Sequence, residues 1–133
     1  MKIRNIILYF LLFPKFGLAE STNYLLFKDL VQYTSSVDAY SNICVKNFNH
    51  KQAETDLFDL ILILKINYRL EENDIMALRD KYHRINKSTT SQLTQLGLNK
   101  RKNLCKKYLK IFERFDKKKN EKLTEILAPA NIQ

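Results

Sequence analysis

The chain has 133 residues, with 23 lysines and arginines against 14 aspartates and glutamates, and a formal net charge of +9. This length suits one domain with a modest hydrophobic core. It contains only two glycines and two prolines. So few turn residues argue against a β protein, which needs many tight turns. We therefore expect a single all-α domain.

The N-terminus has the order of a secretory signal peptide. Lys2 and Arg4 form a positive start, residues 6–13 are apolar, and Ala19 places a small residue at the cleavage position. A buried first helix is the alternative, but Pro14 would break it. The same proline stops the apolar run short of the roughly 20 residues that span a membrane. The sequence predicts a leader over 1–19, cleavage after Ala19 and export by the general secretory route.

The predicted mature domain, residues 20–133, contains Cys44 and Cys105, the two cysteines of the chain. In an oxidising compartment such a pair favours a disulfide. Structural zinc is a poor rival, because it needs about four Cys or His ligands and the chain has only two histidines. We expect a Cys44–Cys105 bridge and no metal or other cofactor.

Helical periodicity predicts four helices, at about 23–47, 51–68, 72–96 and 99–127, with a frayed tail after 128. The first carries one apolar stripe at spacings of three and four residues: Leu26, Leu30, Tyr33, Val37, Tyr40 and Cys44. The third carries a similar stripe: Ile75, Leu78, Tyr82, Ile85, Thr89, Leu93 and Leu96. The fourth carries a third: Leu98, Cys105, Tyr108, Phe112 and Phe115. Each stripe is predicted to face a common core.

The sequence predicts where some of these helices break or end. Residues 86–91 are polar and have weak helix propensity, so the third helix could break there. Gly97 is suited to a left-handed cap, and Asn99 is placed to cap the next helix. Pro129 is expected to end the last helix.

The segment 51–68 is apolar nearly all round, because Leu62, Ile63 and Ile66 add to the stripe that holds Leu57 and Ile61. Two helical interpretations compete: a central helix covered on several sides, or a helix that offers an apolar strip to a partner. A short buried strand is a third interpretation, because a run of Ile and Leu does not fix the period.

Positive charge concentrates in the last quarter of the chain. Without the leader, 20 basic and 14 acidic side chains remain, and residues 97–133 hold 11 of the basic and 4 of the acidic ones. The candidate basic surface comprises Lys100, Arg101, Lys102, Lys106, Lys107, Lys110, Arg114, Lys117, Lys118 and Lys119. It suits a polyanion or an acidic partner, or is simply a solvated helix face. The scarcity of arginine argues against bidentate reading of bases or phosphates.

Short connections would make successive helices antiparallel, giving an up-down four-helix bundle. Cys44 at the end of the first helix and Cys105 near the start of the fourth would then lie at the same pole. Helical period and cysteine position thus point independently to one fold.

No residue constellation indicates catalysis: zinc-protease, phosphate-loop and serine-hydrolase motifs are all missing from the sequence. A small hydrolase using Asp80 and His83 is the weaker hypothesis. In size, leader and composition the chain is similar in kind to small exported bacterial proteins. We expect a periplasmic or secreted protein, or an effector that enters a host, present as a monomer or weak homodimer. It would bind a protein through Leu62, Ile63 and Ile66 or through the basic surface; the alternative is a module that binds nucleic acid or anionic lipid.

Overall fold

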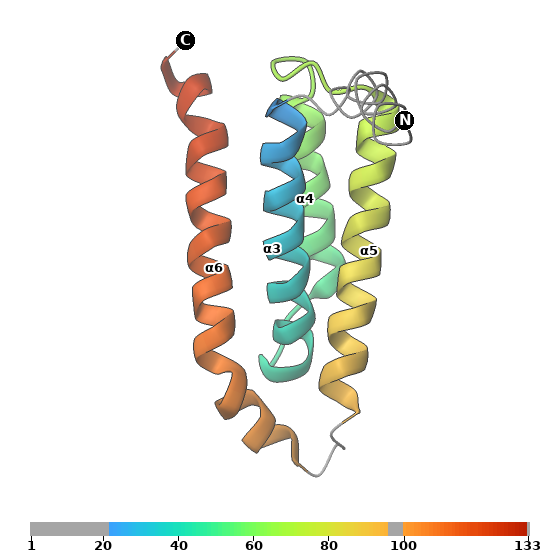
Figure 1. Cartoon of the computed structure of the whole chain (residues 1–133), viewed down its shortest axis with the longest axis vertical. Helices are drawn as coiled ribbons and strands as arrows, with labels where there is room; N and C mark the ends of the chain where they lie inside the picture. The colour runs from blue at the N-terminus through green and yellow to red at the C-terminus, as the bar shows by residue number, and fades with distance from the viewer. Residues whose placement is uncertain (1–21, 96–99, 133) are drawn as a thin grey trace, which may run out of the picture.

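The computed structural model describes residues 22–95 and 100–132. Within these ranges the chain forms α3 (Thr22–Cys44), α4 (His50–Leu64), α5 (Glu72–Thr94) and α6 (Arg101–Ile132), and no strand. The helices run alternately down and up, as Figure 1 shows. The predicted all-α, up-down four-helix bundle is therefore confirmed. The predicted leader with its cleavage site after Ala19, and the caps at Gly97 and Asn99, lie outside the described residues.

The first two helices end earlier than predicted, and each is followed by a turn that contains a left-handed residue. α3 stops at Cys44, and Asn47 follows with φ 65°. α4 stops at Leu64, and the turn after it ends at Arg69 with φ 53°. In that turn the Leu70 amide donates to the Lys65 carbonyl at 2.8 Å, the long bond of a Schellman closure.

The last two helices are more continuous than predicted. α5 runs unbroken through residues 86–91; there Asn86 donates from its side-chain amide to the Ser35 carbonyl of α3 at 3.3 Å. α6 was predicted to stop at 127, but it includes Pro129 and ends at Ile132. Proline removes one amide donor and disfavours a helical residue before it, but neither effect forbids a helix whose other bonds persist.

The first helix, α3, is the central helix of the bundle. In Figure 1 it lies between α5 and α6, with α4 behind it, and it packs closely along both α5 and α6. Its buried side chains accordingly surround most of its circumference: Tyr24, Phe27, Leu30, Val31, Thr34, Ser35, Asp38, Ala39 and Tyr40. Of the three interpretations of segment 51–68, the central helix covered on several sides and the short strand are both wrong. α4 buries one face only, through Leu57, Phe58, Ile61 and Leu64.

Two hydrophobic clusters hold the helices together. The larger joins α3, α4 and α5 through residues such as Phe27, Ile61 and Leu78, and Ile126 of α6 completes it. The smaller lies near the disulfide and comprises Tyr40, Leu93, Leu104 and Phe112. Ile61, Leu78, Tyr40, Leu93 and Phe112 belong to the predicted stripes, because apolar residues at helical spacing share a face. The α3 stripe was predicted less well: Leu30 and Tyr40 are buried, but Leu26, Tyr33, Val37 and Cys44 are only half-buried.

The predicted disulfide is present and ties the end of α3 to the first turns of α6. Cys44 and Cys105 are bridged, with their Cα atoms 5.6 Å apart. Beside the bridge, the Tyr40 hydroxyl donates to the Cys105 carbonyl at 2.7 Å, and the Arg101 Nε donates to the Ile43 carbonyl at 2.6 Å. Residues 61 positions apart are thus joined at one pole of the bundle.

Candidate functional site

The three apolar residues predicted as a partner strip are exposed on α4 and just after it. Leu62 is 40% exposed, Ile63 73% and Ile66 78%. They stay in solvent because α4 turns its Leu57, Ile61 and Leu64 toward the bundle, and residues 62, 63 and 66 lie on the other side of the helix. We call Leu62, Ile63 and Ile66 the α4 strip.

Acidic side chains continue the α4 strip toward the start of α4. Asp56, Asp59, Ile63 and Ile66 follow at steps of three, four and three, so they share one helical face. Asp56 and Asp59 are both exposed, and the Gln52 side-chain amide donates to the Asp56 carboxylate at 2.8 Å. The exposed face of α4 is therefore apolar at one end and negatively charged at the other.

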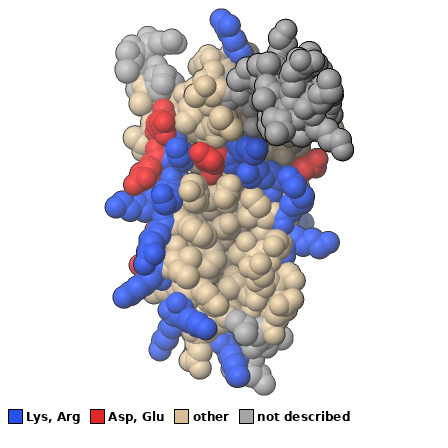
Figure 2. All heavy atoms as spheres, viewed as in Figure 1, with Lys and Arg blue, Asp and Glu red and all other residues tan. Residues whose placement is uncertain are grey.

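The candidate basic surface covers much of α6. All of its ten side chains except Lys119 are exposed. Helical spacing divides several of them into two lengthwise rows: Lys106, Lys110 and Lys117 form one, and Lys107, Arg114 and Lys118 form the other. In Figure 2, basic side chains line both margins of a largely neutral central area. The positive charge is thus spread round the helix rather than focused in one line.

Some of these cations are engaged within the protein. Arg101 donates to the Ile43 carbonyl, as described above. The Lys118 ammonium lies 5.9 Å from the ring centroid of Tyr33 on α3, and the Lys107 ammonium lies 5.5 Å from that of Tyr108. Such contacts hold the aliphatic stems against the bundle and leave the charges at its surface.

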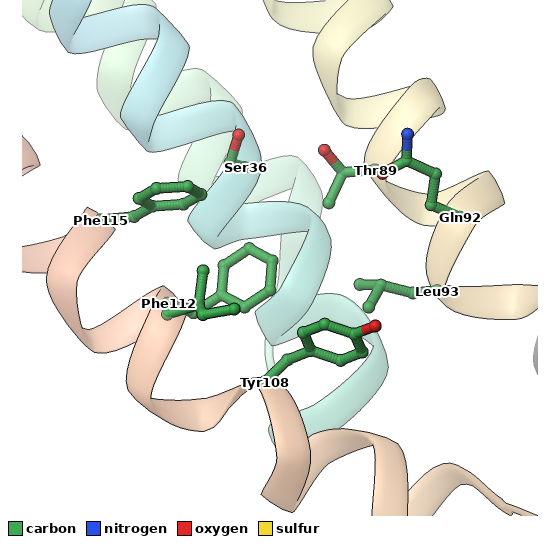
Figure 3. A pocket seen from close by; sticks show the side chains of 8 residues that line it. Ser36, Thr89, Gln92, Leu93, Tyr108, Phe112 and Phe115 are labelled. Carbon is green, nitrogen blue, oxygen red and sulfur yellow. The ribbon is translucent and has the colours of Figure 1, made fainter.

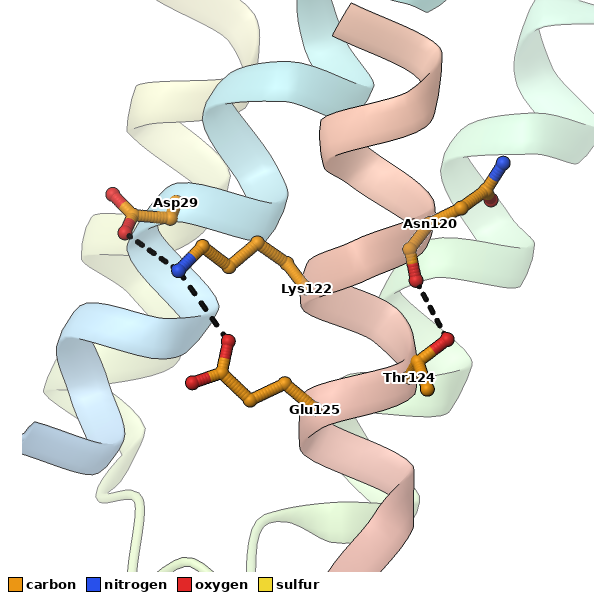
Figure 4. A network of polar contacts seen from close by, with 5 residues as sticks. All are labelled: Asp29, Asn120, Lys122, Thr124 and Glu125. Atoms are coloured by element: carbon orange, nitrogen blue, oxygen red, sulfur yellow. Dashed lines mark hydrogen bonds and ion pairs between the residues drawn. The ribbon is translucent and has the colours of Figure 1, made fainter.

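Toward its C-terminal end, α6 meets acidic partners. The Lys119 ammonium lies 2.9 Å from the Asp116 carboxylate. Lys122 lies 3.7 Å from Asp29 of α3 and 3.4 Å from Glu125, a network drawn in Figure 4. These pairs offset part of the positive charge there, so the unbalanced charge belongs mainly to the first half of α6.

Sequence reasoning missed a buried polar pair between α3 and α5. Asp38 is 5% exposed and Tyr82 is fully buried, and the tyrosine hydroxyl donates to the Asp38 carboxylate at 2.6 Å. Burial raises the pKa of Asp38, and the hydrogen bond from Tyr82 opposes the rise. Burial and the nearby carboxylate also raise the pKa of Tyr82, so it stays the donor. The sequence did contain a signal for this pair, because Asp38 is the one acidic residue within the otherwise apolar segment from Val37 to Tyr40.

Two histidines lie close to this pair. The His50 ring is 6.1 Å from the Tyr82 ring, and its buried Nδ1 has no hydrogen-bond partner. His83, considered with Asp80 in the hydrolase hypothesis, instead places Nε2 2.9 Å from Glu54 of α4. The hydrogen bond between Asp38 and Tyr82 is buried between the two helices. We interpret the pair as a structural link between α3 and α5.

Across residues 22–95 and 100–132, no group of three or more Cys, His, Asp or Glu side chains is placed to hold a metal ion. None of the helices in these ranges has the length and hydropathy to cross a bilayer.

The fold and surface define a small, disulfide-bridged helical bundle. In comparisons with protein families, curated proteins and solved structures, no match to this chain was found.

Proposed function

We propose that this protein is exported and acts by binding another protein, with the α4 strip as its docking surface. The supporting observation is the exposure of Ile63 on α4 and of Ile66 just after it, at 73% and 78%. Contiguous apolar side chains in water are costly, and burying them against a partner recovers that free energy. A periplasmic or secreted setting, or delivery into a host, agrees with the signal-like leader and the disulfide.

The charges beside the strip describe the partner. Asp56 and Asp59 extend the same face, so a complementary surface would be apolar opposite Ile63 and Ile66 and positively charged opposite the two carboxylates. Apolar burial would supply most of the affinity, and the charge pairs at the rim would mainly set orientation and association rate.

Capture experiments with three forms of the mature chain test this proposal: wild type, the double variant Ile63→Ser/Ile66→Ser, and Met76→Ser. Met76 is an exposed apolar residue on α5, 62% accessible, and is therefore a matched control. We expect a protein that wild type and the control retain in high salt and that the double variant loses. A partner held equally by all three forms would refute the strip as the docking surface.

Export is measured separately. Intact mass of the natural protein should correspond to a chain that begins at residue 20 and has both cysteines oxidised. A full-length, reduced chain found inside cells would contradict an exported role, whatever the capture experiment gives.

The basic surface supports a second proposal, that the protein binds a polyanion. The observation that supports this proposal is that many lysines are exposed close together on the first half of α6. Binding would then fall steeply with salt because phosphate contacts release counterions. Replacing Lys106, Lys110 and Lys117 by Gln would flatten the salt dependence, whereas the α4 strip variant would leave it unchanged.

A further inference from the structure

A hollow opens on the side of the bundle where α5 and α6 flank α3. Its volume is about 230 Å³, and side chains from these three helices converge on it in Figure 3. All of its described lining residues are uncharged. Leu93 of α5 lines one side, and α6 contributes the most apolar part: Tyr108, Ile111, Phe112 and Phe115. We call this the apolar hollow.

Side chains that were expected in the core form the open wall of this hollow. Tyr108 and Phe115 belong to a predicted apolar stripe, yet both are only half-buried. Ile111, between them in the sequence, is 40% exposed. These residues remain accessible because α5 and α6 each pack on α3 and lie on opposite sides of it in Figure 1. An apolar wall is thus left facing water, and covering it would be favourable.

Basic side chains stand on either side of the exposed isoleucine of the hollow. Lys107, Ile111, Arg114 and Lys118 follow at steps of four, three and four, so they share one face of α6. All three cations are exposed, and the contact of Lys107 with the Tyr108 ring leaves its charge at the surface. We call these four residues the α6 face. It is apolar at Ile111 and positively charged before and after it.

The α6 face has the chemistry that the α4 strip requires of its partner. That partner was inferred to be apolar opposite Ile63 and Ile66 and positively charged opposite two carboxylates. The α6 face offers an isoleucine at the apolar hollow, with cations within two turns of it. A cavity of about 150 Å³ takes a benzene ring, so the hollow has room for an isoleucine side chain. A second copy of this chain therefore presents the complementary surface.

The spacing of the charges selects the direction in which the two helices would pack. On α4, Asp59 and Asp56 lie about one and two turns before Ile63. On the α6 face, Arg114 and Lys118 lie about one and two turns after its isoleucine. Antiparallel packing therefore brings each carboxylate to a cation. Parallel packing would instead place the outer carboxylate opposite a buried position of α6.

The α4 strip and the apolar hollow lie on different sides of the bundle. α4 contributes no described residue to the hollow, and in Figure 3 it passes behind α3 as seen from the hollow. One copy can therefore use both surfaces at once. A contact between two unlike surfaces joins copies head to tail and does not close a two-fold dimer.

We propose that the α4 strip docks into the apolar hollow of a second copy of this chain, with Ile63 in the hollow and Asp59 beside Arg114. Burial of the isoleucine supplies most of the affinity, and the charge pairs set the direction. One helix face against one hollow makes a small interface, so the association is weak and depends on protein concentration. This inference rests on the proposed function, because it names the partner of the α4 strip.

Sedimentation of the oxidised mature protein at increasing concentration tests the self-association. Wild type should form dimers and then longer species. The variants Ile63→Ser/Ile66→Ser and Ile111→Gln should each weaken the association at least about tenfold, because each loses apolar burial. The controls are Met76→Ser on α5 and Leu109→Gln; Leu109 is 44% exposed on α6 but lines a different hollow. Wild type that stays monomeric, or controls that lose as much as the test variants, would overturn the proposal.

Mixing the two defective variants distinguishes a head-to-tail contact from a two-fold one. Ile63→Ser/Ile66→Ser keeps an intact hollow, and Ile111→Gln keeps an intact strip. At a concentration where wild type associates, each should be monomeric alone. Their mixture should form a one-to-one dimer that grows no further, because each copy offers one working surface. A mixture that stays monomeric, or a dimer formed by either variant alone, contradicts the head-to-tail contact.

A charge exchange tests the antiparallel direction. Asp59→Lys places like charges together and should weaken the association about tenfold, and adding Arg114→Glu should restore most of the loss, because an opposite pair forms again. The control Asp59→Lys/Lys110→Glu has the same net charge, but Lys110 lies in the other row of α6 and should restore nothing. Equal recovery in the two double variants would mean a general attraction and would rule out this pairing.

This inference and the proposed function fail on different results. Wild type that stays monomeric, yet captures a foreign protein that Ile63→Ser/Ile66→Ser loses, would overturn the second copy as partner and leave the α4 strip as a docking surface. Self-association that needs Ile111 but is unaffected by the strip variant would also overturn this inference, without touching the capture experiment. Neither foreign capture nor self-association through the strip would overturn both.

Discussion

Replacing both bridged cysteines, in the variant Cys44→Ser/Cys105→Ser, should lower the free energy of unfolding by about 4 kcal/mol. The bridge joins residues 61 positions apart, and in the chain-entropy model a closed loop of that length restricts the unfolded chain by this amount at 25 °C. The expected stability of a domain of this size is about 5 to 15 kcal/mol. The variant should therefore remain folded but become marginal.

The native structure near the bridge has other contacts that survive the substitution. The Tyr40 hydroxyl donates to the backbone carbonyl of residue 105, and the Tyr40 and Phe112 rings stack at 4.4 Å. Arg101 adds its bond to the Ile43 carbonyl. Because these contacts need no sulfur, the helical spectrum should be retained. The loss should come chiefly from the unfolded state, which becomes less compact, so the urea m-value should rise.

Urea unfolding followed by circular dichroism measures both quantities, with oxidised wild type as the reference. Wild type in a reducing agent is the control, since it should unfold with the variant. A loss below about 1 kcal/mol would refute the entropic reasoning. A variant that lacks helical signal in water would instead mean that the bridge is needed to assemble α6 onto α3.

Two further predictions concern the core. Burial raises the pKa of Asp38 above its ordinary 3.8, so the folded protein binds the Asp38 proton more tightly than the unfolded chain does. The free energy of unfolding should therefore fall as the pH rises from 3.8 through the raised pKa. Asp38→Asn, which still accepts from Tyr82, should flatten this pH dependence in urea titrations; an unchanged slope would contradict it. Ile61→Ala should cost about 2 to 5 kcal/mol because Ile61 is fully buried, whereas Ile63→Ala at 73% exposure should stay within about 0.5 kcal/mol. Equal losses in thermal or urea unfolding would mean that the exposed residue is packed in solution.

Local signals predicted the elements of this protein well. The stripes at three and four residue steps predicted each helix, because residues with that spacing share a helical face. Two helix starts depend on local contacts that the sequence analysis did not identify: the Asn49 side chain accepts from the Gln52 amide at 3.1 Å at the start of α4, and the Asp74 side chain accepts from the Glu71 amide at 2.8 Å at the start of α5. The boundaries that moved lie where left-handed turns or tertiary contacts decide the last residues of a helix.

The candidate surfaces were predicted only in part. Leu62, Ile63 and Ile66 were identified because they exceed what one core-facing stripe holds, but burial within the bundle was the preferred interpretation of the same residues, and their exposure contradicts it. The hollow that Thr89 and Phe115 line beside α3 was not predicted, because both residues have the spacing of ordinary core positions.

The sequence by itself determined which residues form helices, which face of each is apolar and which cysteines could meet. The tertiary structure decided that α3 is the central helix, that Asp38 finds Tyr82, that the α4 strip is left in water and that Ile111 borders an open hollow. The physical reason is that helical periodicity is a property of residues a few positions apart. What covers a helical face depends on the packing of segments up to a hundred residues away, and the hydrophobic effect that drives this packing has no direction of its own.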